Sequence, residues 1–265
     1  MQIKNICQYD AEKFIKKYHY SKIMPKLTKY YLGFFENEEL TGVITLGWGT
    51  QPLQTIRHIF YNHKLESSDY LEIGKMCFLP KCNKNKSFGS QAISMVVKWL
   101  KENTKVMFLY TLADGIMGKC GYVYQASNFK YIGSFKTSIY MDKATGEKIH
   151  PRSAKSLCIE NAKYKGVEKV CWLTDDFCKY KGIEKINGLM FRYILPLNKQ
   201  AKKILNEYNF NLPNPKDKDL KFYKRIDNGM FEEIERPQFN MDIQNYNYQK
   251  NKKEITLFTI CGLEE

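Results

Sequence analysis

Four side chains in this sequence are candidates for acid–base chemistry: Asp114, His19, Glu72 and Tyr124. Asp114 ends a predicted central strand, where a carboxylate can accept a proton, although an Asp there can equally cap the next segment through its side-chain oxygen. His19 is a candidate general base or phosphate contact, and the alternative is a histidine that only hydrogen-bonds within the fold. Glu72 lies on an otherwise apolar strand, where a buried carboxylate is costly unless a partner or a function accounts for it. Tyr124 is either a site tyrosine or a core tyrosine.

A basic loop is the second feature with binding chemistry. Residues 81–90 carry three lysines and end in small residues, and an amphipathic helix follows them. A helix N-terminus offers unpaired backbone N–H groups to anions, so this loop is the predicted cofactor site. Its candidate residues are Lys84, Lys86, Ser87, Gly89 and Ser90. Lysines 81, 84 and 86 and Arg152 suit phosphate contacts, although a run of charge is usually a solvated face.

Apolar periodicity and turn signals predict the elements that position these residues. Ile93, Val96, Val97 and Leu100 recur at helical spacing and predict a helix over residues 89–102. Aromatic and β-branched runs predict strands at 30–36, 40–48, 70–79, 105–111, 129–141 and 187–195. Further helices are expected at 10–18, with Asp10 as a possible cap, and at 198–208. Residues 118–128 could be helical, and residues 49–68 are a loop or a short helix. From residue 213 onward Pro, Asn, Lys and Asp dominate, so we expect a catalytic domain over 1–208 and an extension over 209–265 that packs on it or clamps it.

The charge balance predicts a polyanionic partner. Of 265 residues, 42 are Lys or Arg and 28 are Asp or Glu, which gives a net charge of +14. Hydrophobic residues make up 43% of the chain, which excludes a disordered basic tail as the whole molecule. No apolar run approaches the roughly 20 residues needed to cross a bilayer, and the first residues lack a secretory pattern, so we expect a soluble, cytoplasmic protein without a membrane partner. The eight cysteines have neither disulfide nor zinc spacing and are expected to be free, mostly packing thiols.

Several large enzyme classes are excluded by the loops they require. The sequence contains no G-x-x-x-x-G-K-[ST] phosphate loop, no G-x-G-x-x-G after a strand and no G-x-S-x-G nucleophile elbow. It also lacks the acidic or amide residue followed by Pro-Pro-aromatic that amino-directed methyltransferases use. Methyl transfer is therefore disfavoured.

Several strings taken together resemble the Mom DNA-modification proteins of Mu-like phages, which belong to the GNAT (N-acetyltransferase) superfamily. The resemblance covers residues 10–208, and the strings that carry it are Tyr18-His19-Tyr20-Ser21, Pro25, Leu71-Glu72, Ala113-Asp114, Gly118, Gly121, Tyr124-Gln125-Ala126-Ser127-Asn128-Phe129, Tyr131, Gly133, His150-Pro151-Arg152-Ser153, Arg192-Tyr193 and Pro196-Leu197. Two departures stand out: of the typical GNAT phosphate loop only Gly89 remains, and Gly115 and Phe129 stand where the family has Pro and Trp.

The resemblance implies a GNAT-like α/β fold, with a central mixed and mostly antiparallel twisted sheet flanked by helices. It also implies a transferase that adds a small acyl-derived group, of the carbamoylmethyl type, to the N6 amine of adenine in double-stranded DNA, which shields phage DNA from restriction in the host cytoplasm. The target base must leave the duplex to be reached. Acyl-CoA is the implied cofactor, with a small acyl or aminoacyl donor such as a charged tRNA, or a metal-assisted route, as alternatives.

Roles for individual residues follow from that reaction. Adenine N6 is a poor nucleophile, so a base must remove its proton as the new bond forms, and Asp114 is the first candidate for this base, with His19 and Glu72 beside it. Tyr124 and Asn128 could bracket the extruded base by stacking and edge recognition, or else pack in the core and end a helix. The remaining candidates for substrate or DNA contact are Tyr20, Ser127, His150, Arg152 and Tyr193.

Two rival functions stay open at this point. One is an ordinary acetyl-CoA-dependent N-acetyltransferase acting on a protein, a small amine or RNA, against which the broken phosphate loop argues. The other is a non-catalytic DNA-binding protein that uses the same fold as a scaffold.

Overall fold

The computed structural model describes residues 1–85, 87–150, 155–226, 230–243 and 246, with the backbone alone for residues 83 and 84. By its internal contacts the chain divides into two units. Unit 1 comprises residues 1–137 and 188–221, and unit 2 comprises residues 138–187 and 222–265. The predicted organisation into 1–208 and 209–265 stays a prediction. Two strands, β6 (Lys130–Asp142) and β8 (Ile183–Pro196), continue from one unit into the other.

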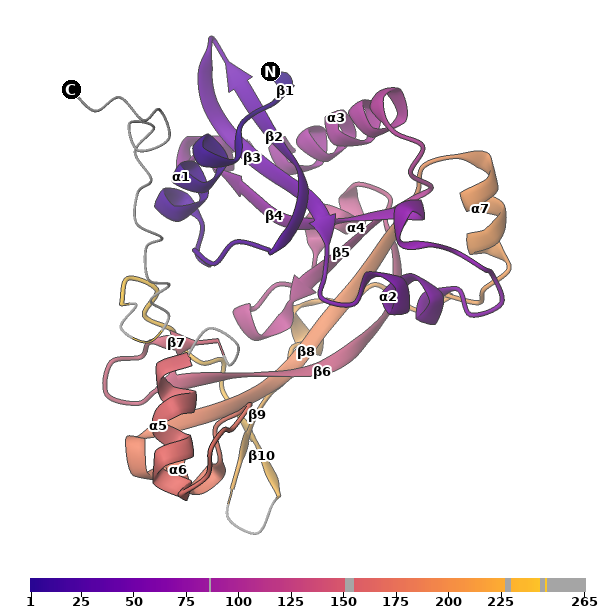
Figure 1. Cartoon of the computed structure of the whole chain (residues 1–265). Coiled ribbons are helices and arrows are strands. Elements are labelled where there is room, and N and C mark those ends of the chain that lie inside the picture. Colours follow the sequence, from indigo (N-terminus) through magenta and orange to yellow (C-terminus); the bar gives the residue numbers. More distant parts are fainter. Residues whose placement is uncertain (86, 151–154, 227–229, 244–245, 247–265) are drawn as a thin grey trace, which may run out of the picture. The chain divides into compact units, whose positions relative to one another are not determined.

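A twisted mixed sheet forms the centre of unit 1 (Figure 1). Its strands are β1 (Gln2–Asn5), β2 (Leu27–Glu36), β3 (Glu39–Trp48), β4 (Tyr70–Phe78) and β5 (Phe108–Asp114), followed by β8 and β6 in the order β1-β2-β3-β4-β5-β8-β6. β4 and β5 pair in parallel, whereas β1–β2, β2–β3, β3–β4 and β5–β8 pair antiparallel. The predicted α/β fold class with a mostly antiparallel sheet is therefore confirmed.

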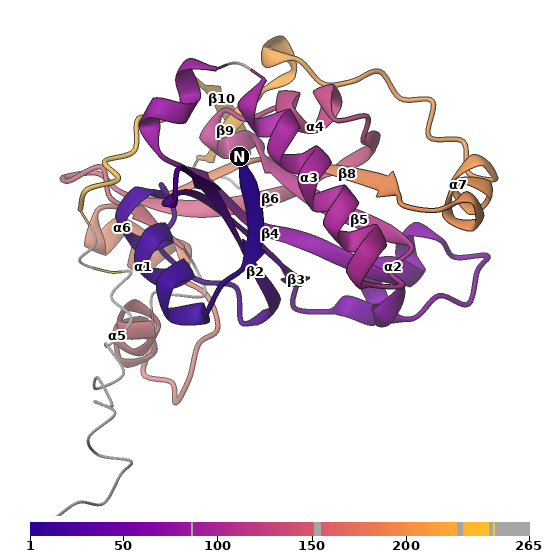
Figure 2. The same cartoon turned by 90° about the horizontal axis from the view of Figure 1, so that it is seen from above.

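Helices cover both faces of this sheet. The helices of unit 1 are α1 (Gln8–Tyr18), α2 (Pro52–Ile59), α3 (Phe88–Asn103), α4 (Tyr122–Ala126) and α7 (Lys199–Asn206). Side chains alternate along a strand, so Val43 of β3 packs with α1 on one face while Ile44 packs with α3 on the other. Figure 2 shows α1 and α3 on opposite sides of the sheet. Short 3-10 turns lie at η1 (Ser67–Asp69), η2 (Pro80–Lys84), η3 (Gly115–Met117) and η4 (Asp217–Asp219).

The parallel strands β4 and β5 separate part-way along their length. Their pairing runs from Tyr70–Phe108 to Ile73–Thr111 and stops there, although β4 continues to Phe78 and β5 to Asp114. Beyond Ile73 in β4 and Thr111 in β5, the two strands no longer pair with each other. This separation creates room for a site next to the end of β5.

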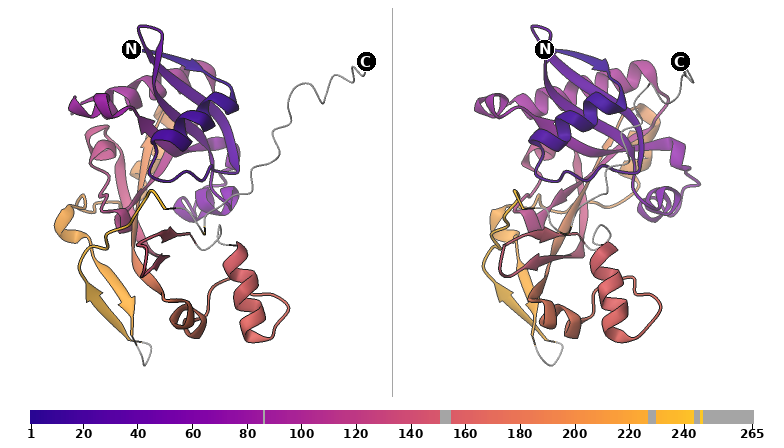
Figure 3. Two further views of the ribbon diagram at one scale, coloured as in Figure 1. Left: turned by 90° about the vertical axis from the view of Figure 1, so that its left-hand side faces the viewer. Right: turned by 60° about the vertical axis from the view of Figure 1, so that its left-hand side comes forward.

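Unit 2 contains β7 (Lys148–Ile149), α5 (Lys155–Lys165), α6 (Asp175–Lys181) and a hairpin of β9 (Phe222–Arg225) with β10 (Phe231–Ile234), which Figure 3 shows from two sides. Its own core includes Tyr140, Leu157 and Phe177. The sequence did not predict α5, because its apolar residues do not keep to one face: Leu157 is buried and Ile159 is 60% exposed.

Local corrections concern caps and boundaries. The first helix begins at Gln8 and is capped by Cys7, whose Sγ accepts the N–H of Asp10, so the prediction of Asp10 as the cap was wrong. Helix α4 is shorter than the predicted 118–128 because Gly118 and Gly121 adopt left-handed conformations that no helix continues through. The strand predicted at 105–111 lies at Phe108–Asp114, with Asp114 as its last residue.

Two predictions from composition can be compared with the described residues. Every cysteine in that part of the chain is a free thiol; Cys77, Cys82, Cys120 and Cys178 are buried as packing residues, whereas Cys7 and Cys171 are exposed. None of the described helices combines the length and apolar character that a membrane span requires.

Candidate active site

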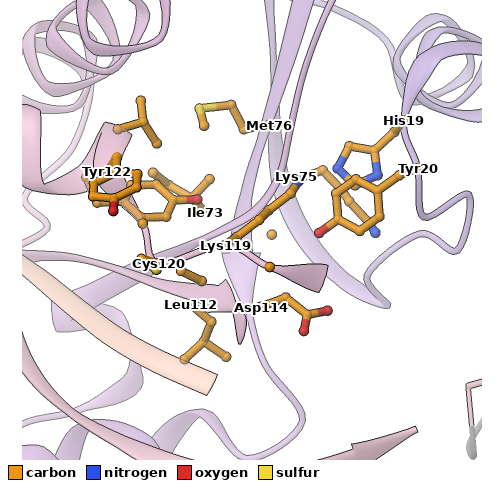
Figure 4. A pocket seen from close by; sticks show the side chains of 16 residues that line it. His19, Tyr20, Ile73, Lys75, Met76, Leu112, Asp114, Lys119, Cys120 and Tyr122 are labelled. Carbon is orange, nitrogen blue, oxygen red and sulfur yellow. The ribbon is translucent and has the colours of Figure 1, made fainter. Parts of the chain in front are cut away.

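A pocket of about 320 Å³ opens where β4 and β5 separate. Three segments of unit 1 line it: the residues after α1, the part of β4 from Ile73 to Met76, and the chain from Leu112 through η3 to Tyr124. Its volume falls within the roughly 300–1,000 Å³ range of small-molecule sites. Figure 4 shows the polar side chains of His19, Tyr20, Lys75 and Asp114 toward one side, with Met76 and Tyr122 on the other.

The residues after α1 form a tightly held aromatic pair. The His19 ring stacks on the Tyr20 ring with 4.3 Å between the ring centroids. Lys119 Nζ lies 3.7 Å from the centroid of the Tyr20 ring, a cation–π contact. His19 Nδ1 is 2.9 Å from both the N–H and the carbonyl oxygen of Ser21, so this nitrogen is engaged within the loop in either tautomer. The pair is therefore positioned rather than free to rotate.

Lys75 of β4 connects the sheet to the segment that follows α1. Its Nζ donates to the carbonyl oxygen of Ser21 at 3.1 Å and to Ser21 Oγ at 2.9 Å. An ammonium group thus stands in the pocket wall beside the aromatic pair. With Lys119 it gives this side of the pocket two cationic groups.

Asp114 has a structural role and also lines the pocket. Its Oδ1 accepts the backbone N–H of Ile116 at 3.1 Å and of Met117 at 3.3 Å, which caps η3 as the alternative interpretation expected. In Figure 4 the carboxylate lies on the same side of the pocket as the Tyr20 hydroxyl. Burial, and after it the negative charge of Asp114, raises the pKa of Tyr20 well above its ordinary value. The Tyr20 phenol therefore stays protonated at neutral pH and can donate a hydrogen bond.

The opposite wall is built around α4. Tyr193 is fully buried, its hydroxyl donates to the carbonyl oxygen of Cys120, and Gln125 Nε2 donates to that hydroxyl at 3.0 Å. Gly121 has a φ of +85°, and a Cβ there would lie 2.6 Å from the Tyr193 ring, so only glycine fits. Tyr124 is 9% exposed and lines the pocket, and burial raises its pKa. This wall is rigid.

Tyr122 presents an aromatic ring to the pocket. It is 51% exposed, lines the pocket, and its hydroxyl accepts the backbone N–H of Asp217 at 3.1 Å. The ring is therefore accessible and anchored at its far end. Among the aromatic residues that line the described pocket, Tyr122 is the most exposed, and its hydroxyl contact holds the ring in place.

Glu72 is not among the residues that line the pocket. It pairs with Tyr110 across β4 and β5 and accepts the backbone N–H of Gly49. Burial raises the pKa of the Glu72 carboxyl to about 7, and the hydrogen bond from Gly49 opposes that rise. Its charge contributes to the raised pKa values of Tyr70, Tyr110 and Tyr124, so it belongs to a tyrosine-rich cluster behind the pocket wall.

The remaining predicted contact residues lie elsewhere. Ser127 Oγ donates to the carbonyl oxygen of Val123 at 2.7 Å, and Asn128 is exposed with a left-handed φ of 62°, as expected of a residue that ends a helix. His150 is exposed in unit 2, and Arg152 lies outside the described residues. The structure brings together His19, Tyr20, Asp114 and Tyr124 in one pocket, whose wall rests on Tyr193.

The predicted cofactor loop is engaged mainly within itself. Asn85 Oδ1 accepts both the N–H of Ser87 at 3.0 Å and its hydroxyl at 2.8 Å, and Ser90 Oγ donates to the carbonyl oxygen of Ser87. A Cβ at Gly89 would lie 2.8 Å from Val123, so this glycine lets α3 approach α4. Lys86 and the side chain of Lys84 lie outside the described part of the chain. The described atoms of the loop do not form an open row of amides of the kind that holds a pyrophosphate.

The family of the chain follows from sequence comparison. A family model described as the Mom protein family matches residues 1–216. The chain belongs to the Mom family. Among curated proteins, the methylcarbamoylase Mom of Escherichia phage Mu is 29% identical over 218 residues, which cover 82% of this chain and 84% of that protein.

Solved structures similar to this chain are acetyltransferases. An N-acetyltransferase from Staphylococcus aureus Mu50 aligns with 74% of this chain and 97% of its own, at 15% identity and a TM-score of 0.37. An aminoglycoside 6'-acetyltransferase type Ii aligns with 75% of this chain and 98% of its own, at 9% identity and a TM-score of 0.39.

Several pocket residues of this Mom-family chain were not predicted from the sequence: Lys75, Lys119, Cys120 and Tyr122. Lys119 and Tyr122 flank the Gly118 and Gly121 positions of the family resemblance, and those two turns direct the intervening chain into the pocket. Lys75 gave no signal of its own, since it becomes a site residue only because β4 continues beyond its pairing with β5. Within the described residues no three His, Cys, Asp or Glu side chains are grouped to hold a metal ion.

Proposed function

We propose that this Mom-family protein is a DNA-modification transferase that adds a small acyl-derived group, of the carbamoylmethyl type, to the N6 amine of adenine. The observation that carries the proposal is the pocket in which Asp114, Tyr20, His19 and Lys119 converge at the separation of β4 and β5. A methylcarbamoylase that is 29% identical to the chain supports the chemical class of the transferred group.

The distribution of charge supports DNA as the partner of the unit that contains the pocket. Unit 1 contains 26 Lys and Arg against 13 Asp and Glu, a net charge of +13, whereas unit 2 contains 16 against 15, a net charge of +1. If the positive charge were spread evenly over both units, solubility alone would explain the excess of Lys and Arg. Concentration in the unit that bears the pocket is what a phosphate-binding enzyme requires.

The reaction needs one proton removed and one leaving group accommodated. The N6 nitrogen forms a bond to the electrophilic carbon of the donor, the bond from that carbon to the leaving group breaks with its electron pair, and one N6 proton passes to a base. We assign the base to Asp114, whose Oδ1 is held by two backbone N–H groups that fix the carboxylate in place. The Tyr20 hydroxyl, kept protonated by its raised pKa, is positioned to donate a hydrogen bond to negative charge on the donor.

The target base must leave the duplex to enter this pocket, which costs a few kcal/mol. Tyr122 offers an accessible ring on which the base can stack, and base–aromatic stacking recovers about 1–3 kcal/mol. Lys75 and Lys119 supply positive charge for the phosphates next to the extruded nucleotide or for an anionic donor.

The described part of the cofactor loop does not fit acyl-CoA well. Ser87 has its N–H and hydroxyl bonded to Asn85, and Gly89 is used for helix packing. Acyl-CoA and an aminoacyl donor are both carriers of the required electrophilic carbon, and a supply experiment with each carrier identifies which one the protein uses.

Deproteinised DNA separates the proposal from its rivals. DNA purified from cells that express the protein should resist restriction endonucleases whose sites contain adenine, and DNA from cells expressing Asp114→Asn should be cut normally. A non-catalytic DNA-binding protein leaves no protection once protein is removed. An ordinary N-acetyltransferase would instead release thiol from acetyl-CoA with a protein, amine or RNA substrate and leave the DNA susceptible.

A further inference from the structure

One stretch of unit 1 concentrates lysines beside the pocket. Between residues 13 and 29 the chain carries six lysines and no acidic residue. These are Lys13, Lys16, Lys17, Lys22, Lys26 and Lys29, which we call the α1 ridge; all are exposed except Lys22, which is half-buried. Within the described part of the chain, the ion pairs of the ridge are limited to Lys16 with Glu12.

The ridge belongs to the segment that supplies His19 and Tyr20 to the pocket. Lys17 is two residues before His19, and Lys22 is two residues after Tyr20. Since a chain spans at most about 3.6 Å per residue, the Cα atom of each lies within about 7 Å of a pocket residue. The lysine side chains that start from these positions are therefore close enough to the pocket to contact phosphates beside an extruded nucleotide.

The loop half of the ridge is fastened to the sheet. Lys75 Nζ holds Ser21, and Gly74 lies so close to Pro25 that a Cβ would be 2.9 Å from the Pro25 ring. Thr28 Oγ1 donates to the carbonyl oxygen of Pro25 at 3.1 Å. These interactions hold the backbone that carries Lys22 and Lys26 in place before any partner binds, which lowers the entropic cost of binding.

Ordinary helix electrostatics do not account for the whole ridge. Lys16 and Lys17 lie in the last turn of α1, where the helix dipole favours cations. Lys22, Lys26 and Lys29 lie beyond the helix, so that explanation does not extend to them. On the opposite face of the sheet, α3 shows the usual solvated pattern, in which Lys98 alternates with acidic Glu102 at 4.0 Å.

We propose that the α1 ridge binds the phosphate backbone of duplex DNA on either side of the adenine that enters the pocket. The proposal rests on the proposed function for the identity of the polyanion. It assigns the positioning of the duplex to lysines outside the pocket, which leaves the pocket residues for the base itself.

The test compares two triple variants of the full-length protein. K17Q/K22Q/K26Q removes three ridge lysines, and K98Q/K101Q/K105Q removes three exposed lysines on α3 or just after it with the same loss of net charge. Binding to a mixed-sequence DNA duplex is measured by fluorescence anisotropy from 50 to 300 mM salt. Thermal unfolding by circular dichroism verifies that both variants are folded.

The ridge variant should reduce the slope of log affinity against log salt by about 0.9 for each phosphate that is no longer neutralised, and affinity at 0.15 M salt by about fivefold per phosphate. The control variant should bind like the wild-type protein. Equal losses of affinity in both variants, or an unchanged slope in the ridge variant, would overturn the proposal. A loss confined to single-stranded RNA, measured in parallel, would overturn the assignment to duplex DNA.

A separate readout distinguishes this proposal from the proposed function. Deoxyadenosine from DNA of cells expressing the wild-type protein is examined for added mass. If deoxyadenosine is modified but the ridge variant keeps the wild-type slope of log affinity against log salt, only the proposed DNA binding by the ridge is contradicted. If the slope falls in the ridge variant alone but no modified deoxyadenosine is found, DNA binding by the ridge is supported and the proposed reaction is contradicted.

Discussion

Replacing Asp114 separates its observed capping role from its proposed role as the base, because each role depends on a different property of the side chain. The cap of η3 needs one oxygen that accepts the N–H groups of Ile116 and Met117 at 3.1 and 3.3 Å, whereas proton removal needs a basic carboxylate. Asp114→Asn keeps an oxygen acceptor and loses the base. Asp114→Ala loses both.

The magnitudes follow from that division. Loss of a cap costs about 1 kcal/mol, which lowers the Tm of a chain of this size by about 2–4 °C. Loss of a general base lowers a rate by about 10²–10⁴-fold. Asp114→Asn should therefore melt within about 2 °C of the wild-type protein, Asp114→Ala should melt lower, and both should lose the rate equally.

The assay is the initial rate at which modified deoxyadenosine accumulates in DNA after induction, measured beside the Tm of each purified protein. If Asp114→Asn modified DNA within a few-fold of the wild-type rate while Asp114→Ala lost activity together with stability, the carboxylate would be only a cap. The assignment of Asp114 as the base would then be refuted.

Two further predictions concern residues beside the pocket. Tyr122→Ala should lower the rate of modification by roughly 5- to 150-fold, the equivalent of about 1–3 kcal/mol of stacking. Tyr122→Phe keeps the ring and should modify DNA at nearly the wild-type rate. Equal losses of rate in both variants would show that the hydroxyl contact to Asp217 matters rather than the ring. Burial raises the pKa of the Glu72 carboxyl in the folded protein to about 7, from an ordinary value of 4.5. Between pH 4.5 and 7 the folded protein therefore binds a proton that the unfolded chain has lost. The free energy of unfolding should fall by up to about 3 kcal/mol as pH rises through this range. Urea unfolding of Glu72→Gln from pH 4 to 8 should lack this fall, and a pH dependence identical to that of the wild-type protein would contradict burial of the Glu72 carboxyl.

The sheet and its principal helix could be predicted from local pattern. The hairpin, β4, α3 and β8 all have periodicity or β-branched runs that local rules recognise, and each lies close to its predicted position. Helix α5 could not be predicted in this way, because its buried Leu157 and Ala162 are accompanied by buried Asn161, whose side-chain amide donates to the carbonyl oxygen of Trp172. Such a polar interaction arises only from tertiary structure.

The site shows a similar limit. Asp114 ends β5 and was found as a candidate from its residue type and position, whereas His19 and Tyr20 follow α1 and became candidates mainly through the family resemblance. Lys75 could not be found, since its place in the pocket depends on where β4 and β5 stop pairing, which is a property of two strands that are more than thirty residues apart. Tyr193 matched the family resemblance and yet is fully buried, and its hydroxyl donates a hydrogen bond to the carbonyl oxygen of Cys120 in the pocket wall.

Mass spectrometry of nucleosides from DNA of cells that express the protein is the decisive test of the proposed reaction. We expect a new deoxyadenosine that carries the carbamoylmethyl-type group on N6, present with the wild-type protein and absent with Asp114→Asn at equal expression. Unchanged deoxyadenosine in cells that contain folded wild-type protein, or a group attached to another base, would contradict it.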